Sequence, residues 1–191
     1  MQKKKRSLVD ANLGLFRRRS RGQVWVETMI YTLIAFALIG LVLAFVRPKI
    51  QQIQDKSVID QSISVLNDID SVINSLGTSG NQRVLDVSIN KGTLTVDGVN
   101  DKIYISVPSN SEYSQVGQDV PDGNVIVRTD QAGSAYNVLL TIDYSGLYNI
   151  TFNGLDAAKE LNQAPTAYKL LIANNGKDIY GKTLVNMEVV S

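Results

Sequence analysis

The hydrophobic positions of the chain fall into three successive patterns, and the first is an unbroken apolar run. Residues 24–46, VWVETMIYTLIAFALIGLVLAFV, contain one charged side chain, Glu27. At about 1.5 Å per residue, a helix of this length reaches roughly 34 Å, which is enough to cross a hydrocarbon core of about 30 Å. Helices buried in a soluble core rarely stay apolar on every face for about six turns. The run therefore predicts one transmembrane helix.

The second pattern, in residues 47–77, has helical periodicity. Apolar side chains recur at spacings of three and four, which indicates an amphipathic helix packed against the domain that follows. Gly77 is expected to end this helix. Pro48 removes one backbone hydrogen bond, so we expect a kink or a short break there. The apolar stripe consists of Ile59, Ile63, Leu66, Ile69, Ile73 and Leu76, and Asp55, Asp60, Asp68 and Asp70 lie off or beside it.

The third pattern, in residues 78–191, alternates between apolar and polar positions, as strands do. We expect a hairpin of residues 83–89 and 93–97, and a short helix or a long connection at 155–163. The inward faces are expected to hold Val125/Val127, Val138/Leu140/Ile142 and Val185/Met187/Val189. Further strands are expected at 102–108, 124–129, 136–144, 147–152, 167–174 and 184–190. The predicted fold class is α+β, with a long N-terminal transmembrane and amphipathic helix followed by an antiparallel β-sandwich-like head domain.

Composition removes several classes of chemistry. The chain has neither Cys nor His, which excludes disulfides, thiol catalysis, zinc sites and Ser-His-Asp triads. Paired carboxylates near an apolar pocket and phosphate-binding glycine-rich loops are also missing from the pattern. Asp97 with Asp101, or Asp119 with Asp122, are weak candidates for calcium, but neither pair has EF-hand spacing. We therefore expect no enzyme and no cofactor.

Charge is distributed unevenly and gives the membrane orientation. Residues 1–22 carry eight basic groups and one acid, a net charge of +7, whereas residues 23–191 carry a net charge of −6. The positive-inside bias places the N-terminus in the cytoplasm and residues 47–191 outside the cell. The run is long for a secretory signal and no A-x-A pattern follows it, so the exported part is expected to stay anchored. The negative head domain disfavours nucleic-acid binding.

The junction between the basic segment and the apolar run carries a family resemblance. Residues 19–27 read RSRGQVWVE, a small residue followed by an apolar helix with an acid at its fifth position. This arrangement resembles the prepilins of the type IV pilin superfamily, closest to archaeal members with a class III signal peptide. The resemblance implies cleavage by a prepilin peptidase between Gly22 and Gln23, which removes a leader containing Arg17, Arg18, Arg19 and Arg21. Trp25 departs from the family pattern, where a small or polar residue is frequent.

The resemblance also implies a role for Glu27. In a filament the carboxylate would pair with the new ammonium of Gln23 on a neighbouring copy, which sets the register of assembly. The plainer alternative is that Glu27, one turn into the span and near the headgroups, has no function. On this interpretation the chain divides into a cleaved leader (1–22), a transmembrane helix (23–46), an amphipathic continuation (47–77) and an extracellular head domain (78–191), which resembles the pilin fold.

The expected function is that of a pilin-like structural subunit in an extracellular adhesive filament. Its partners would be membrane lipid, the prepilin peptidase, an assembly platform with its ATPase, and copies of itself. A minor pilin that primes or caps a pilus is a related reading. The alternative is a single-pass membrane protein whose outer domain binds a ligand or envelope component without polymerising. Asn149, in the sequence Asn-Ile-Thr, is a candidate N-glycosylation site.

Overall fold

The computed structural model describes residues 21–190, and the chain forms two compact units, Met1–Pro48 and Lys49–Ser191. We call them the N-terminal unit and the head unit. Helix α1 (Arg21–Ser75) contributes to both and is continuous through Pro48. A break at Pro48 is therefore not seen, and the kink expected there stays a prediction.

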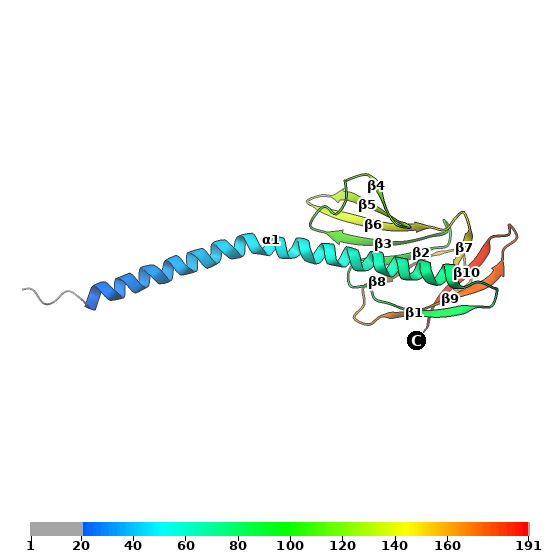
Figure 1. Cartoon of the computed structure of the whole chain (residues 1–191), viewed down its shortest axis with the longest axis horizontal. Helices are drawn as coiled ribbons and strands as arrows, with labels where there is room; N and C mark the ends of the chain where they lie inside the picture. The colour runs from blue at the N-terminus through cyan, green and yellow to red at the C-terminus, as the bar shows by residue number, and fades with distance from the viewer. Residues whose placement is uncertain (1–20, 191) are drawn as a thin grey trace, which may run out of the picture. The chain divides into compact units, whose positions relative to one another are not determined.

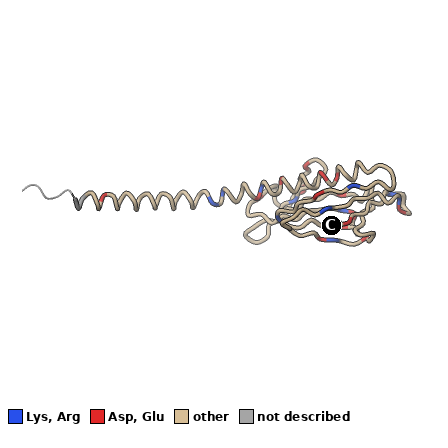
Figure 2. The backbone as a smooth tube through the Cα atoms, turned by 90° about the horizontal axis from the view of Figure 1, so that it is seen from below, with Lys and Arg blue, Asp and Glu red and all other residues tan. Residues whose placement is uncertain are grey.

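The N-terminal unit presents an apolar helical surface. In the described part of the chain, α1 is the one helix that is long and apolar enough to cross a membrane, and no residue of its most apolar window is buried. Large side chains such as Trp25, Phe36 and Phe45 are two-thirds or more exposed. The stretch between Glu27 and Arg47 carries no charge, as the uniform colour of the tube shows (Figure 2). A membrane-spanning helix is the structure that these exposed residues favour.

The helical part of the head unit ends close to the predicted position. Helix α1 stops at Ser75, and Gly77 has a φ of +63°, a conformation that glycine adopts without strain. The carbonyl of Leu76 accepts a hydrogen bond from Asn81 Nδ2 at 2.6 Å, and that of Gly77 accepts one from Asn174 Nδ2 at 2.8 Å. These side-chain amides satisfy carbonyl groups that the end of a helix leaves unpaired.

The rest of the head unit consists of two sheets, both of which lie alongside α1 (Figure 1). Nearly all neighbouring strands are antiparallel, but β10 and β7 pair in parallel, which differs from the expected antiparallel arrangement. The six-stranded sheet has the order β4 (Asp119–Asp122), β5 (Val125–Ala132), β6 (Ala135–Asp143), β3 (Lys102–Ser109), β2 (Thr93–Asp97), β8 (Ala158–Asn162). The four-stranded sheet has the order β1 (Gln82–Val87), β9 (Tyr168–Lys177), β10 (Thr183–Val190), β7 (Tyr148–Phe152).

The predicted hairpin of residues 83–89 and 93–97 is wrong. Strand β1 pairs with β9 in one sheet, whereas β2 pairs with β3 and β8 in the other. The turn between β1 and β2 carries the chain from sheet to sheet. Gly92 in this turn has a φ of +88°, and a Cβ atom added there would lie 2.1 Å from the carbonyl oxygen of Ser106 in β3. Only glycine permits this close approach of two backbones.

Two short edge strands also differ from the sequence prediction. Residues 155–163 contain strand β8 where a helix or connection was expected, and β4 lies in a segment where no strand was expected. In β8 only Leu161 is buried, and every residue of β4 is exposed. Edge strands with so little buried surface lack the apolar alternation by which a strand is recognised.

The core of the head unit is built from α1 and both sheets together. All six residues of the predicted apolar stripe, from Ile59 to Leu76, are buried. The predicted inward faces are also buried, except for Val189 near the end of β10, which is 42% exposed. Because helical side chains share the core with the strands, the two sheets are confirmed but a simple β-sandwich is not.

Candidate functional site

The first candidate site is the carboxylate of Glu27 on the exposed apolar surface of α1. Among the described residues its one side-chain partner is Tyr31, whose hydroxyl donates a hydrogen bond to Oε1 at 3.3 Å. The neighbouring hydroxyls of Thr28 and Thr32 donate instead to backbone carbonyls four residues earlier. Glu27 therefore keeps most of its acceptor capacity for a group outside its own helix.

Tyr31 is a member of this site that the sequence analysis missed. The signal was present, because residues four apart on a helix lie one above the other. The phenol is a neutral donor and does not offset the negative charge. On insertion scales a charged residue at the centre of a membrane helix costs about 2.5–3.5 kcal/mol, and less near the interface. A cationic partner would thus be favoured more strongly than the tyrosine.

The expected cleavage site lies at the start of α1. Gly22 and Gln23 have helical backbones, as has Arg21, whereas Arg17, Arg18 and Arg19 fall outside the described residues. A peptidase that binds an extended backbone must first unwind this turn. Glycine in a helix is about 1 kcal/mol less favourable than alanine, so Gly22 makes local unwinding easier.

The head unit contains a second polar cluster, centred on Asp55 of α1. The carboxylate is almost fully buried and accepts hydrogen bonds from Lys91 Nζ at 2.6 Å and from the Asn110 backbone amide at 2.8 Å. Burial alone raises the pKa of Asp55, but these bonds and the lysine charge outweigh it, so the pKa lies below its usual value. The cluster joins the helix to two separate turns of the sheets.

Asp70, about four helical turns further along, forms a similar connection. Its two carboxylate oxygens accept hydrogen bonds from the hydroxyl of Tyr144 at 3.0 Å and from Asn124 Nδ2 at 2.9 Å. Burial of the phenol, together with the charge and hydrogen bond of Asp70, raises the pKa of Tyr144. Asp55 and Asp70 were predicted to lie off or beside the apolar stripe, and the structure buries both as anchors between α1 and the sheets.

Asn149 lies in β7, within the strand expected at 147–152. Its side-chain amide donates to Asp178 Oδ2 at 3.2 Å. Thr151 of the same sequon is buried, and its hydroxyl lies 3.1 Å from Asn186 Oδ1. Attachment of a glycan would require this strand to be accessible, so modification after folding is disfavoured, and glycosylation stays a prediction.

Three of the four candidate calcium ligands, Asp97, Asp101 and Asp119, are occupied by protein donors. Asp97 accepts from two backbone amides of its own turn, and Asp101 accepts from the Ile150 amide and from Lys182 Nζ. Asp119 pairs with Arg128 at 3.3 Å. Within residues 21–190, no cluster of three or more acidic side chains could hold a metal ion.

Comparisons with known proteins add no family assignment to this geometry. No protein-family model, curated protein or solved structure matches the chain. Function therefore has to be argued from Glu27, the helix around it and the surfaces of the head unit.

Proposed function

We propose that the protein is a pilin-like structural subunit, inserted as a membrane precursor, cleaved after Gly22 and assembled into an extracellular filament. The observation that carries this proposal is one carboxylate, Glu27, on a helical surface that is otherwise apolar and exposed. A side chain of this kind needs a partner that its own helix does not supply. A second copy of the helix, with a new amino terminus, supplies a cation.

Cleavage changes the charge balance in the direction that assembly needs. The leader carries a net charge of +7, which holds the helix end at the cytoplasmic face. Its removal leaves one ammonium at Gln23, four residues before Glu27. In a staggered bundle of helices that ammonium neutralises Glu27 of an adjacent copy, and the exposed apolar surface packs against neighbours instead of lipid.

The head unit would then form the outer part of the filament. Its anchors at Asp55 and Asp70 keep the second half of α1 on the sheets. The expected partners are membrane lipid before assembly, a prepilin peptidase, an assembly platform with its ATPase, and other copies of the chain. The role is structural and adhesive, not catalytic.

N-terminal mass analysis of protein isolated from its native host tests the first step. The expected result is a chain that begins at Gln23 with a free amino terminus. A cyclised Gln23 would show the cut but lacks the ammonium on which the pairing with Glu27 depends. Retention of Met1 in the mature protein would remove the basis of the proposal. Gly22→Val is the matched variant, because it blocks a cut after a small residue while leaving the apolar run unchanged.

The alternative is a single-pass surface protein that binds a ligand or envelope component without polymerising. The apolar helix would then be an anchor, and Glu27 would have no partner. Replacement of Glu27 by alanine separates the two functions. Filament formation should be lost and membrane insertion retained if the protein is a pilin-like subunit, whereas neither should change if it is a monomeric anchor.

A further inference from the structure

The hairpin that joins β9 and β10 ends in two exposed apolar side chains. Ile179 is 90% exposed and Tyr180 is 83% exposed, the highest values among the large hydrophobic residues of the described chain. Leu147, at 73%, lies beside them, since its carbonyl accepts a hydrogen bond from the Thr183 amide. A cluster of such residues at one tip is typical of a surface that is covered by a partner.

The tip is held rigidly although it is exposed. Asp178 Oδ1 accepts hydrogen bonds from the backbone amides of Tyr180 and Lys182, each at 2.9 Å. At the base of the turn, Lys182 Nζ binds Asp101 Oδ2 at 3.1 Å, and Asn149 binds the other oxygen of Asp178. A loop fixed in this way loses little conformational entropy when it binds, which favours its use as an anchor.

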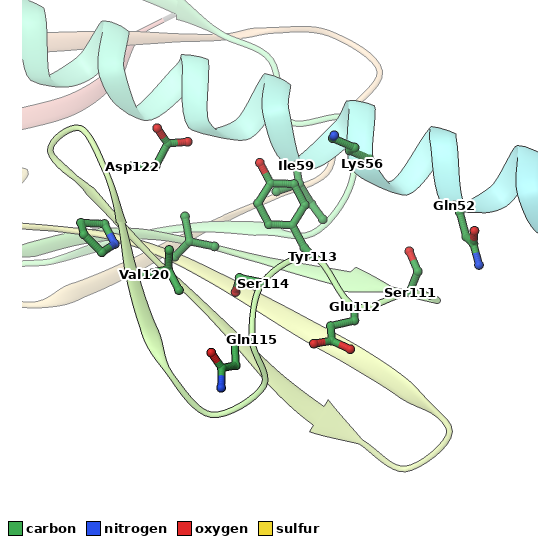
Figure 3. A pocket seen from close by; sticks show the side chains of 12 residues that line it. Gln52, Lys56, Ile59, Ser111, Glu112, Tyr113, Ser114, Gln115, Val120 and Asp122 are labelled. Atoms are coloured by element: carbon green, nitrogen blue, oxygen red, sulfur yellow. The ribbon is translucent and has the colours of Figure 1, made fainter.

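The same unit carries an open groove between α1 and the segment that leads into β4 and β5. The groove has a volume of about 810 Å³, within the range of about 300–1,000 Å³ typical of ligand sites. Its apolar lining consists of Ile59, Tyr113, Val120, Pro121 and Val127. Figure 3 shows the Tyr113 ring beside Ile59, and Glu112 and Asp122 at the margins. The groove thus has an apolar interior large enough for two side chains, with acidic groups at its edge.

The tip and the groove lie at opposite ends of the head unit. Ile59 in the groove precedes the end of α1 at Ser75 by sixteen residues, or about 24 Å of helix. The tip lies beyond that end, because Asn174 and Gly176 at the base of the hairpin contact the chain at residues 77–80 (Figure 1). One copy therefore cannot place its own tip in its own groove.

The tip carries one negative side chain, Asp178, whose carboxylate accepts hydrogen bonds from its own turn and from Asn149. The neighbouring lysine is complementary to the margin of the groove. Lys177, next to the tip, forms no ion pair with any described residue. On the groove margin, Glu112 and Asp122 also form no ion pair with any described residue. Lys56 contributes one positive charge there. A lysine approaching two acids and one lysine experiences a net attraction, which orients an incoming tip.

From these observations we propose that the Ile179–Tyr180 tip of one copy occupies the groove at Ile59, Tyr113 and Val120 of the next copy. The contact joins different surfaces of identical subunits. Repeated contacts of this kind form a ring where the rotation closes and an open array where it does not, and the filament requires the open array. This inference rests on the proposed function, because it identifies the head-to-head partner within the filament. It adds a contact outside the membrane that is independent of Glu27.

Cysteine crosslinking of the full-length protein tests the contact, because the natural chain contains no cysteine. Lys177→Cys and Glu112→Cys place thiols at the proposed meeting point and leave the apolar anchors intact. The double variant should give a ladder of disulfide-linked oligomers under mild oxidation, and a mixture of the two single variants should stop at dimers. A disulfide needs Cα atoms less than about 7 Å apart. A bond within one copy is therefore excluded, because the tip and the groove lie at opposite ends of the head unit.

The matched control combines Lys177→Cys with Val84→Cys, which is exposed but lies in the four-stranded sheet. A ladder no stronger than that of the control would overturn the inference. Charge reversal gives a second measurement by sedimentation of the detergent-solubilised chain. Lys177→Glu and Glu112→Lys should each weaken self-association about tenfold, or about 1.4 kcal/mol, and the combined variant should recover it. Failure of the combined variant to recover would also count against the contact.

The two proposals fail in different ways. Filaments that begin at Gln23 and require Glu27, but give only the control level of crosslinking, would overturn the tip-in-groove contact and leave the pilin-like function standing. Crosslinked ladders from a protein that retains Met1 and forms no filament would support the tip-in-groove contact and overturn the pilin-like function. Circular dichroism of each variant shows that the head unit is folded, which is expected because Lys177, Glu112 and Val84 are exposed.

Discussion

Lys91 and Asp55 are 36 residues apart in the chain and form the shortest ion pair of the described residues, with Nζ 2.6 Å from Oδ1. The aspartate belongs to α1 and the lysine to the turn between β1 and β2. The Asn110 amide binds the second carboxylate oxygen at 2.8 Å. The Asp55 side chain thus holds the start of β2 and the end of β3 against α1.

Replacement of Asp55 by asparagine is expected to destabilise the head unit by about 2 kcal/mol. Breaking a fully buried pair costs about 3–5 kcal/mol, and a smaller loss is expected here because Lys91 is about one-third exposed and partly screened by water. Urea unfolding of the detergent-solubilised chain, followed by the near-ultraviolet circular dichroism of its tyrosines, measures the change. Lys102→Gln breaks the exposed pair with Asp143 and should cost less than about 0.5 kcal/mol. Equal losses in both variants would contradict the role of Asp55.

The contribution of Asp55 should disappear in acid. Its folded-state pKa lies below the unfolded value of 3.8, so the unfolded chain takes up a proton first as the pH falls. The stabilisation is complete above the unfolded pKa and is lost as the pH falls through the folded pKa. Wild-type protein should therefore exceed Asp55→Asn in stability by a constant amount between about pH 5 and 8, and the difference should shrink below about pH 4. Urea unfolding at each pH measures it, and a difference that does not change with pH would exclude this linkage.

Periodicity in the sequence was enough to predict α1 and most of the strands. The stripe from Ile59 to Leu76 repeats with helical spacing because one face of the helix is buried, and all six of its residues lie in the core. Strand β2 was placed with its observed bounds because Leu94 and Val96 alternate with polar residues in the sequence, and both are buried. Signals of this kind depend only on residues close together in the chain.

Pairing and the polar anchors depend on residues far apart in the chain, and these were missed. The partner of β1 is β9, more than eighty residues later, so a local turn signal at Gly92 suggested the wrong hairpin. Asp55 and Asp70 look like solvent-facing acids in a helical pattern, because their donors come from turns and strands elsewhere. At the proposed membrane site, Glu27 was identified from the sequence, whereas its partner Tyr31 was recognised only in the structure.

Gly92→Ala is expected to destabilise the head unit by about 3 kcal/mol or more. Its φ of +88° is unfavourable for alanine, and the new Cβ would lie 2.1 Å from a backbone oxygen that cannot move without distorting β3. Gly133→Ala is the matched control, since Gly133 has a φ of +67° but no atom within 4 Å of the added Cβ. The control should lose only the conformational cost of about 1–2 kcal/mol. Urea unfolding measures both losses of unfolding free energy. Equal losses in the two variants would show that the close approach of Gly92 to Ser106 does not restrict residue 92 to glycine.

Tyr31→Phe separates the hydrogen bond within α1 from the charge interaction proposed between copies. The substitution removes the hydroxyl group, whose oxygen lies 3.3 Å from Glu27 Oε1, and keeps the aromatic ring. A hydrogen bond of this type contributes about 0.5–1.5 kcal/mol, whereas the ammonium of a neighbouring copy offsets a full charge. We therefore expect Tyr31→Phe to form filaments in the native host and Glu27→Gln to form none, as counted by electron microscopy.

Processing has to be measured in the same samples. A variant that is not cleaved would also fail to assemble, for a reason unrelated to the pairing of Glu27. Mass analysis should show Gln23 as the first residue in the wild type and in both variants. If Glu27→Gln is cleaved normally and yields no filaments while Tyr31→Phe yields them, the carboxylate acts through its charge. If the two variants lose filaments equally, the Glu27–Tyr31 pair acts as a unit within one helix, and the proposed pairing between copies is wrong.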